Sequence, residues 1–394
     1  MKVFKLRHHR HLLLPLYVIS LLLVFHTYIS AYINSSFLEK FISNKSVGII
    51  YTTGSALSIL FFLFVSRVLH KVGNFKLTLS LLFIDLVSLI GMAIADSLKY
   101  AIPLFLINII VVPIIFFNID IFMEEKIGSK ENTTGGSRGL LLTLASLIGA
   151  VTPLVSSLLV NEDGVNFSKI YILSAIMLIP VIVLLIKNLK DFEDPKYTEI
   201  DVFKAIHNFW KNKNIRNVFL SNFTLQSFFF LMVVYVPIYL TQNMNLSWSE
   251  FGIVMFFAQL AYVFLEYPIG IIADKYIGEK EMMSLGFFIL IVSLSWMSFL
   301  NTDSIFVWSV VMFVSRVGAS LVEATTESYF FKQTKSNDAQ IISFFRITRP
   351  MSYIVGSLMA SLSLLYLPFN FLFIVFSILS VPALFFTANI IDTK

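Results

Sequence analysis

Charged residues inside long apolar segments are the feature of this sequence that most directly implies chemistry. A charged side chain at the middle of a bilayer costs at least about 2.5–3.5 kcal/mol on insertion scales, so each one needs a partner or a function. The densest group lies within two or three helical turns of the ends of three apolar segments and comprises Glu266, Glu323, Glu327, Arg346 and Arg349. This group predicts a network of ion pairs. Three roles stay open: a fixed structural lock, a gate whose ion pairs break, and direct contact with a ligand.

The first half of the chain repeats part of this pattern. Asp120 and Glu124 lie four residues apart near the end of an apolar segment, so they share one helix face, as two of the glutamates above do. After a short polar stretch, Arg138 follows early in the next segment, in the position that Arg346 holds in the second half. The repeat indicates an internal duplication and adds Asp120, Glu124 and Arg138 to the predicted ion network.

Other polar residues lie deeper in the apolar segments. Arg316 is near the middle of its segment and has no carboxylate close to it in the sequence. A histidine titrates near neutral pH, so His26 suits either proton binding or a hydrogen-bonded packing role. Asp85 is a further candidate proton site, and Asn222 and Gln226 can offer neutral hydrogen bonds to a solute.

The elements that carry these residues follow from composition. Of 394 residues, 57% are hydrophobic and 13% are charged, whereas soluble domains carry about 25% charged residues. The surplus of apolar surface must therefore face lipid. The sequence has no cysteine, which excludes disulfides, cysteine-ligated zinc and a thiol nucleophile. It also lacks a phosphate-binding loop motif and a zinc-protease motif, so we expect no metal and no cofactor.

A membrane-spanning helix needs about 20 mostly apolar residues, and twelve segments qualify, which predicts an all-α membrane protein. The predicted spans are 12–34, 47–69, 77–96, 100–123, 139–160, 169–187, 216–241, 250–273, 282–301, 304–330, 340–366 and 369–391. The first is expected to remain as an uncleaved span. Most of the 29 Lys and Arg residues lie in one set of alternate loops, which predicts that both termini are cytoplasmic. This clustering in short loops also argues against nucleic-acid binding as the reason for the net charge of +5.

One longer polar stretch interrupts the spans near the middle of the chain. Residues 188–215 separate six predicted spans from the next six, and their part 202–210 is amphipathic at helical spacing. We therefore expect a six-helix unit over 1–187, a cytoplasmic linker over 188–215 with a helix on the membrane surface, and a second six-helix unit over 216–394.

The loop after the eighth predicted span carries a specific sequence signal. It reads Gly-Ile-Ile-Ala-Asp-Lys-Tyr-Ile-Gly-Glu-Lys over 270–280, and its informative positions are Gly270, Ala273, Asp274, Lys275, Gly278 and Lys280. Glycines suit a close helix approach and a tight turn, and a carboxylate suits a neighbouring helix N-terminus. The equivalent loop of the first half keeps its basic residues and the turn glycine Gly73, but Ser66 replaces the first glycine and His70 the aspartate.

The 270–280 loop, the helix count and the central linker resemble those of the major facilitator superfamily. The resemblance implies two pseudo-symmetric six-helix bundles around a central cavity, worked by alternating access. It places Arg316 on a cavity-lining span, where it suits an anionic solute or a fixed pairing with a buried carboxylate. We expect a monomeric secondary transporter of a small solute in the cell membrane, surrounded by lipid and coupled to protons. Two alternatives stay open, namely a polytopic membrane enzyme and a non-transporting receptor or scaffold.

Overall fold

The computed structural model describes residues 2–127, 131–160, 167–195, 209–273, 277–333 and 344–391, and every regular element in these ranges is a helix. Helices are expected here because lipid offers no hydrogen bonds, so a spanning backbone must satisfy its own polar groups. Ten of the helices are long and apolar enough to cross a membrane. The class predicted from composition, an all-α membrane protein, is therefore confirmed.

The long helices fall on the predicted spans. In chain order they are α1 (Lys2–Ala31), α3 (Asn44–Val72), α4 (Asn74–Ile94), α5 (Leu98–Ile127), α6 (Glu131–Leu159), α7 (Ser168–Leu189), α9 (Lys213–Phe230), α11 (Trp248–Ile272), α12 (Glu279–Phe299), α13 (Ile305–Gln333), α15 (Thr348–Tyr366) and α16 (Phe371–Ala388). Helices α6 and α15 are not among the ten helices that are long and apolar enough to cross a membrane. The apolar part of α6 is the shorter stretch Thr143–Leu159. The count of twelve spans thus stays a prediction.

Two features of the backbone were not predicted. A short helix, α2 (Asn34–Glu39), follows α1. The seventh span continues beyond α9 through two π-helical turns, η1 (Leu231–Tyr235) and η2 (Tyr239–Asn243), on either side of α10 (Val236–Ile238). Such π-turns add one residue per turn and are frequent at functional sites.

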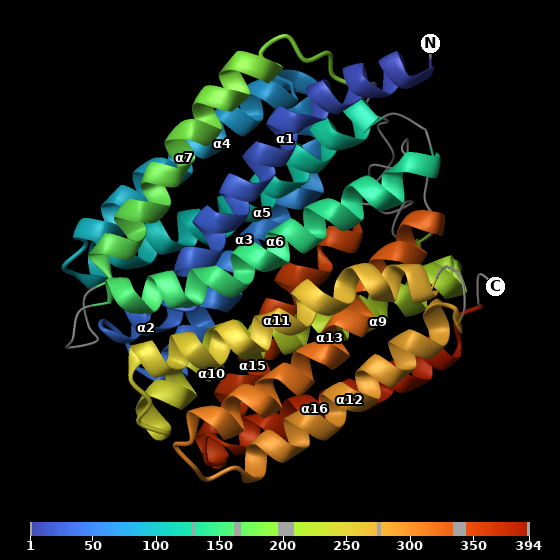
Figure 1. Ribbon diagram of the computed structural model, residues 1–394. Helices are drawn as coiled ribbons and strands as arrows, with labels where there is room; N and C mark the ends of the chain where they lie inside the picture. The colour runs from blue at the N-terminus through green and yellow to red at the C-terminus, as the bar shows by residue number, and fades with distance from the viewer. Residues whose placement is uncertain are drawn as a thin grey trace.

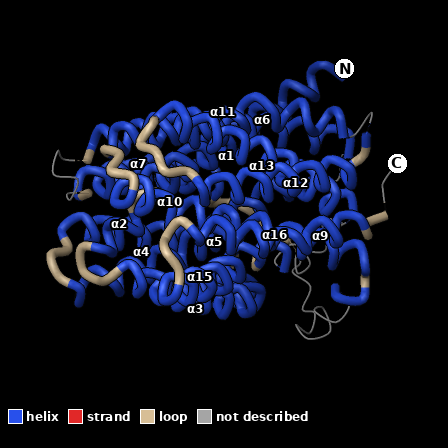
Figure 2. The backbone as a smooth tube through the Cα atoms, turned by 90° about the horizontal axis from the view of Figure 1, so that it is seen from below, coloured by secondary structure: helices blue, strands red, loops and turns tan. Residues whose placement is uncertain are grey.

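Helix packing shows the internal duplication directly. In the first half, α1 packs on α7, α6 and α5, while α4 packs on α5 and α7, and in the second half α9 and α12 make the corresponding contacts with α16, α15 and α13. Figure 1 shows the two sets of helices side by side, and Figure 2 shows that the described backbone consists of helices joined by loops and turns. Between the halves, the most extensive contacts pair α6 with α11 and α3 with α15. These two pairs also correspond to each other under the repeat.

Two glycines bring the halves together at equivalent positions. Gly48, near the start of α3, would place an added Cβ 3.1 Å from the carbonyl oxygen of Ser357 on α15. Gly252, near the start of α11, would place one 3.0 Å from the carbonyl oxygen of Pro153 on α6. Each is the fifth residue of its helix. Only glycine allows such an approach of two helices without displacing a neighbour.

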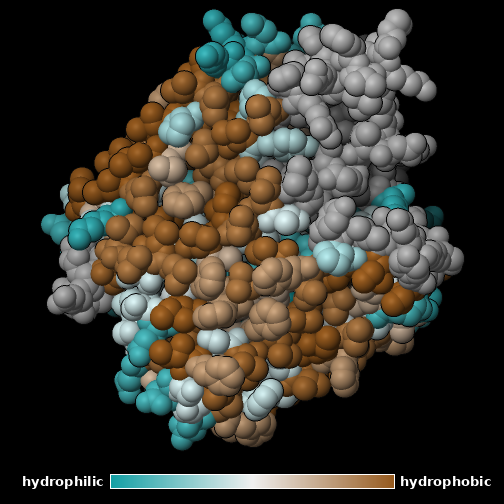
Figure 3. Space-filling model, in the orientation of Figure 1, coloured by the Kyte–Doolittle hydropathy of each residue, from teal (hydrophilic) through white to brown (hydrophobic). Residues whose placement is uncertain are grey.

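The outer helices carry the lipid-facing surface. Exposed apolar residues recur every three or four positions on the four helices α4, α7, α12 and α16; on α4 they are Phe83, Val87, Ile90 and Ile94, and on α7 they are Ile172, Ile176, Ile179 and Val183. This spacing makes a continuous apolar stripe along a helix. Figure 3 shows the resulting apolar surface between more polar ends. Of the predicted surface helix at 202–210, only the last two residues lie within the described part of the chain.

Candidate functional site

Arg316 is a buried charged side chain that lies within reach of Tyr32 from the first half. It lies near the middle of α13 and is 2% exposed. Its Nη1 donates a hydrogen bond to Ser315 Oγ at 3.0 Å, and its guanidinium carbon lies 5.2 Å from the ring centre of Phe228 on α9. Among the described residues, no carboxylate forms an ion pair with it. A buried cation without an anion is costly, so this position favours a negatively charged partner.

A hydrogen bond between the halves lies beside Arg316. The Nε2 of Gln259, on α11, donates to the hydroxyl of Tyr32 at the end of α1, 2.8 Å away. Tyr32 is also within electrostatic reach of Arg316, and its ring makes an edge contact with Phe251 at 6.0 Å. Arg316, Phe228, Tyr32 and Gln259 thus form one group that combines a cation, aromatic faces and a neutral amide.

A second group lies further along α11 and α13, towards the end that carries the chain termini. Ser146 Oγ, on α6, donates to Glu266 Oε2 at 2.7 Å and so joins the halves. The charges of Glu266, Glu323 and Arg349 act on one another and on the hydroxyl of Tyr28 from α1. Groups of both halves, Tyr28 and Glu323 among them, lie around Arg349.

Arg346 forms an ionic bridge between the halves. Its Nη1 lies 2.7 Å from Glu327 Oε1 on α13, and its Nε lies 3.6 Å from Asp120 Oδ2 on α5. One arginine of the second half thus contacts a carboxylate from each half. The side chains of Glu124 and Arg138, also predicted in this network, lie outside the described part of the structure.

The other deep candidates fall inside single halves. His26 and Asp85, which the sequence analysis treated separately, are neighbours within the first half, with Nε2 and Oδ2 3.0 Å apart. Asn222 Nδ2 donates to Thr348 Oγ1 at 2.8 Å, which ties α9 to α15. Gln226, one turn further along α9, is half-buried and makes no hydrogen bond to the described residues.

The 270–280 loop is only partly described, and Asp274 and Lys275 lie outside the described residues. Gly278 has a φ of 92°, as a tight turn requires, and its counterpart Gly73 has a φ of 83°. The close helix approach expected of Gly270 is not seen, because a Cβ built there meets no described atom within 4 Å. Ala273 is buried beside α12 and α13, and Lys280 lies in the first turn of α12.

Two carboxylates that were not predicted as site residues stabilise the turns at Gly73 and Gly278. Asp194, which follows α7, accepts a hydrogen bond from the backbone N–H of Asn74 at 2.9 Å and so stabilises the start of α4. Glu279, fully buried after Gly278, lies 2.5 Å from Lys332 Nζ at the end of α13. The first-half loop therefore has a carboxylate at its helix start, although His70 replaces the expected aspartate.

Sequence reasoning missed the aromatic part of the site. Tyr28 and Tyr32 are four residues apart and so share a face at the end of the first span. Tyr262 on α11 and Tyr353 on α15 are linked to the same charged groups. The i, i+4 spacing of the two tyrosines was the available signal, but tyrosines are so common in membrane spans that it did not single them out.

The fold defines a multi-pass α-helical membrane protein. The family model of the Major Facilitator Superfamily matches residues 129–325 and 218–392, and the chain belongs to this superfamily. It is therefore a secondary transporter with a small-molecule solute. No curated protein matches the sequence.

Two solved structures are similar over nearly the whole chain. A crystal structure of an aspartate-to-alanine mutant of the nucleoside transporter NupG has a TM-score of 0.75 at 14% identity, covering 96% of this chain and 99% of that chain. The crystal structure of nucleoside transporter NupG has a TM-score of 0.72 at 14% identity, with 96% and 98% covered. At this identity the likeness shows the fold alone, and the fold is the one predicted from the 270–280 loop.

Proposed function

We propose that this protein moves a small organic anion across the cytoplasmic membrane by alternating access, with protons as the coupling ion. The observation that carries the proposal is Arg316, a buried cation without a carboxylate partner among the described residues, at the contact between two repeated sets of helices. An anionic group of the solute supplies the missing counter-charge. Phe228 and the Tyr32–Gln259 pair suit a planar or hydrogen-bonding body attached to that group.

The moving units in this proposal are 1–187 and 216–394, joined by the cytoplasmic linker over 188–215. The repeated packing within each half supports rigid units, and rocking of repeats around a fixed site is the general behaviour of repeat-built transporters. One chain contains the whole solute path, so the working unit is a monomer. The basic residues of alternate loops support an orientation with both termini in the cytoplasm.

A ligand screen on the purified protein tests the anion site. Thermal unfolding is measured with a panel of carboxylates, organic phosphates and uncharged nucleosides, for the unmodified protein, Arg316→Ala and Arg316→Lys. We expect an organic anion to raise the unfolding temperature of the unmodified protein, to lose its effect with Arg316→Ala, and to keep part of it with Arg316→Lys. Arg67→Ala removes an exposed arginine at the end of α3 and is the matched control. Stabilisation by a neutral nucleoside that persists with Arg316→Ala would overturn the anion assignment.

A further inference from the structure

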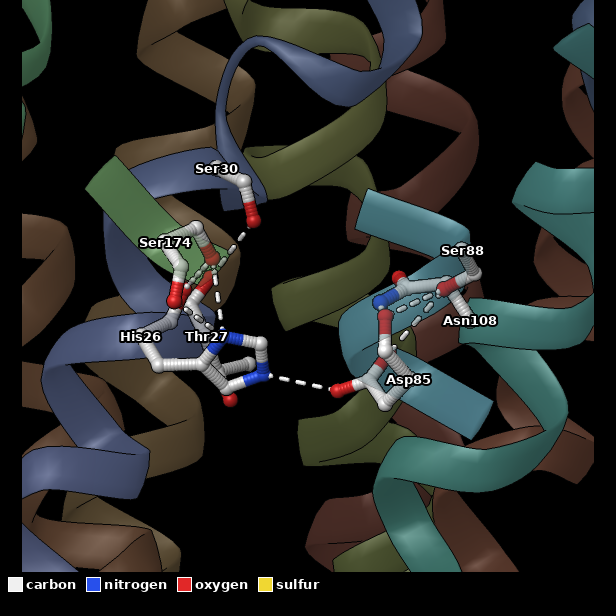
Figure 4. A network of polar contacts seen from close by, with 7 residues as sticks. All are labelled: His26, Thr27, Ser30, Asp85, Ser88, Asn108 and Ser174. Atoms are coloured by element: carbon white, nitrogen blue, oxygen red, sulfur yellow. Dashed lines mark hydrogen bonds and ion pairs between the residues drawn. The ribbon is translucent and has the colours of Figure 1, made fainter. Parts of the chain in front are cut away.

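A buried polar network links four helices inside the first half. His26 of α1 contacts Asp85 of α4 and Ser174 of α7, and Asp85 in turn contacts Asn108 of α5 and Ser88 of its own helix (Figure 4). His26 and Ser88 are 1% exposed, while Asp85 and Ser174 are 0% exposed. An acid and a base are therefore held together away from both water and lipid.

The hydrogen bonds to Ser174 determine which ring nitrogen of His26 carries a hydrogen. Ser174 Oγ donates its single hydrogen to the backbone oxygen of His26 at 2.8 Å. The same Oγ lies 2.8 Å from His26 Nδ1, and the carbonyl oxygen of Ser174, which can only accept, lies 3.3 Å from it. All three contacts are satisfied together only when Nδ1 is the donor.

The other ring nitrogen then faces a carboxyl oxygen. His26 Nε2 and Asp85 Oδ2 are 3.0 Å apart, within ion-pair distance, and neither atom makes a hydrogen bond to the described residues. With the ring hydrogen on Nδ1, a neutral imidazole would present a lone pair to a carboxylate, and this contact is repulsive. One more proton on the pair removes this repulsion, either on Nε2 as an imidazolium or on Oδ2 as a carboxylic acid. Both forms contain the same number of protons.

We propose that the His26–Asp85 pair is the site where this transporter binds its proton, and that the described conformation is the proton-loaded one. When the proton leaves, from a ring nitrogen of His26 or from Asp85 Oδ2, a net negative charge remains between the helices. Asn108 Nδ2, 2.7 Å from Asp85 Oδ1, is then the main neutral donor that supports the carboxylate. A lone buried carboxylate is costly, so loss of the proton favours a helix arrangement that admits water.

Few other groups compete for this proton. The other side chains drawn in Figure 4 are hydroxyls and an amide, from Thr27, Ser30, Ser88, Asn108 and Ser174. The remaining titratable groups of the four helices are tyrosines (Tyr17 and Tyr28 of α1, Tyr100 of α5, Tyr171 of α7) and groups near helix ends. The latter comprise Lys2, Lys5, Arg7, His8, His9, Arg10, His11, Lys76, Lys99, Asp120, Glu124, Glu125, Lys126, Lys169 and Lys187. Within the described residues, none forms an ion pair with His26 or Asp85.

The geometry of α1 connects this pair to the solute site. Tyr28 lies two residues after His26, and Tyr32 follows the end of the helix, where it contacts Gln259 and the surroundings of Arg316. A shift of α1 that opens the His26–Asp85 contact therefore also moves two residues of the inter-half site. This coupling rests on the proposed transport function, whereas the binding of the proton does not.

Nitrogen NMR of the histidine rings tests proton binding without any solute. The chain has six histidines, so ¹⁵N-histidine-labelled protein is compared with His26→Gln to assign the His26 ring and with His70→Gln as a matched control. We expect the His26 ring at pH 7.5 to carry a hydrogen on Nδ1 and to share a second proton at Nε2. Asp85→Asn should abolish the second proton, and His70→Gln should leave the His26 signals unchanged. A His26 ring with a bare Nδ1 and hydrogen on Nε2 alone would overturn the proposal.

A second measurement tests the coupling. Proteoliposomes are loaded with the anion identified by the thermal screen, and a pH gradient of one unit is imposed, which supports about tenfold accumulation for one proton per solute. The unmodified protein and His70→Gln should accumulate the anion, and Asp85→Asn should not accumulate it above equilibrium. Accumulation by Asp85→Asn would overturn the coupling role. If no variant transports any solute while the NMR result holds, the proposed function fails and the proton site stands.

Discussion

Replacing Gly252 by valine should shift the balance between two arrangements of the halves. Gly252 lies where α11 meets α6, at the end of the molecule that carries α2. A Cβ there would lie 2.8 Å from Ser157 Cβ and 3.0 Å from the carbonyl oxygen of Pro153. Ser157 Oγ cannot simply turn away, because it donates to the Leu154 carbonyl at 2.8 Å. The extra atoms are therefore tolerated only if the helices separate.

The size of the effect follows from the cost of overpacking. Extra methyl groups in a well-packed contact cost about 1–3 kcal/mol, which corresponds to a roughly 5- to 150-fold change in the ratio of closed to open arrangements. The arrangement that separates α6 from α11 at this end does not carry the cost. Gly91→Val is the matched control, because its added Cβ would meet Leu104 within the first half and leaves the contact between the halves unchanged.

The absence of cysteine makes the measurement direct. Spin labels on cysteines introduced at Ser43 and Asn243, which are exposed on opposite halves at this end, report their separation by double electron–electron resonance. We expect one short distance in the unmodified protein and in Gly91→Val, and a second, longer distance in Gly252→Val. An unchanged distance distribution in folded Gly252→Val would refute the view that this glycine contact holds the end closed.

Three further outcomes are expected. Burial raises the pKa of Glu39 to about 7 against the opposing hydrogen bond from Gln242, so the protonated acid favours closure. The contribution of Glu39 to closure is full below its ordinary pKa of 4.5 and is lost as pH rises through about 7. The same spin-label distance should therefore lengthen in that window, but not in Glu39→Gln. Gly278→Ala should lower stability by about 1–3 kcal/mol in thermal unfolding because of its positive φ, whereas Gly270→Ala, which meets no described atom, should change it little. Arg346→Ala should weaken closure at the end that carries the chain termini by up to about 1 kcal/mol, since its ion pairs are partly exposed. Spin labels placed across that end should move apart.

The spans were predictable because their signal is local. A run of apolar residues long enough to cross a bilayer identifies a helix without knowledge of its neighbours, and the helices accordingly lie on the predicted spans. The turn at Gly278 was predictable for the same reason, as was the presence of a duplication, since both halves carry matching short patterns. The short helix α2 and the π-helical turns depend on tertiary contacts and gave no such signal.

The pairing of polar residues could not be predicted from the sequence. His26 and Asp85 were each singled out, but nothing local indicates that two residues on different helices meet. The same holds for the bridge from Arg346 to Asp120 and for Tyr32 with Gln259, which join the halves. The close helix approach expected of Gly270 has no partner among the described residues and stays a prediction.

A reversible cross-link between the halves tests the central claim most directly. Thr52 on α3 and Ser357 on α15 make hydroxyl-to-hydroxyl contact across the halves, so cysteines at these two positions can form a disulfide. Exchange of the anion identified by the thermal screen is then measured in proteoliposomes before oxidation, after oxidation and after reduction. Alternating access predicts that exchange stops when the bond forms and returns when it is reduced. Continued exchange with the disulfide fully formed would contradict a mechanism in which the halves must separate where Thr52 meets Ser357.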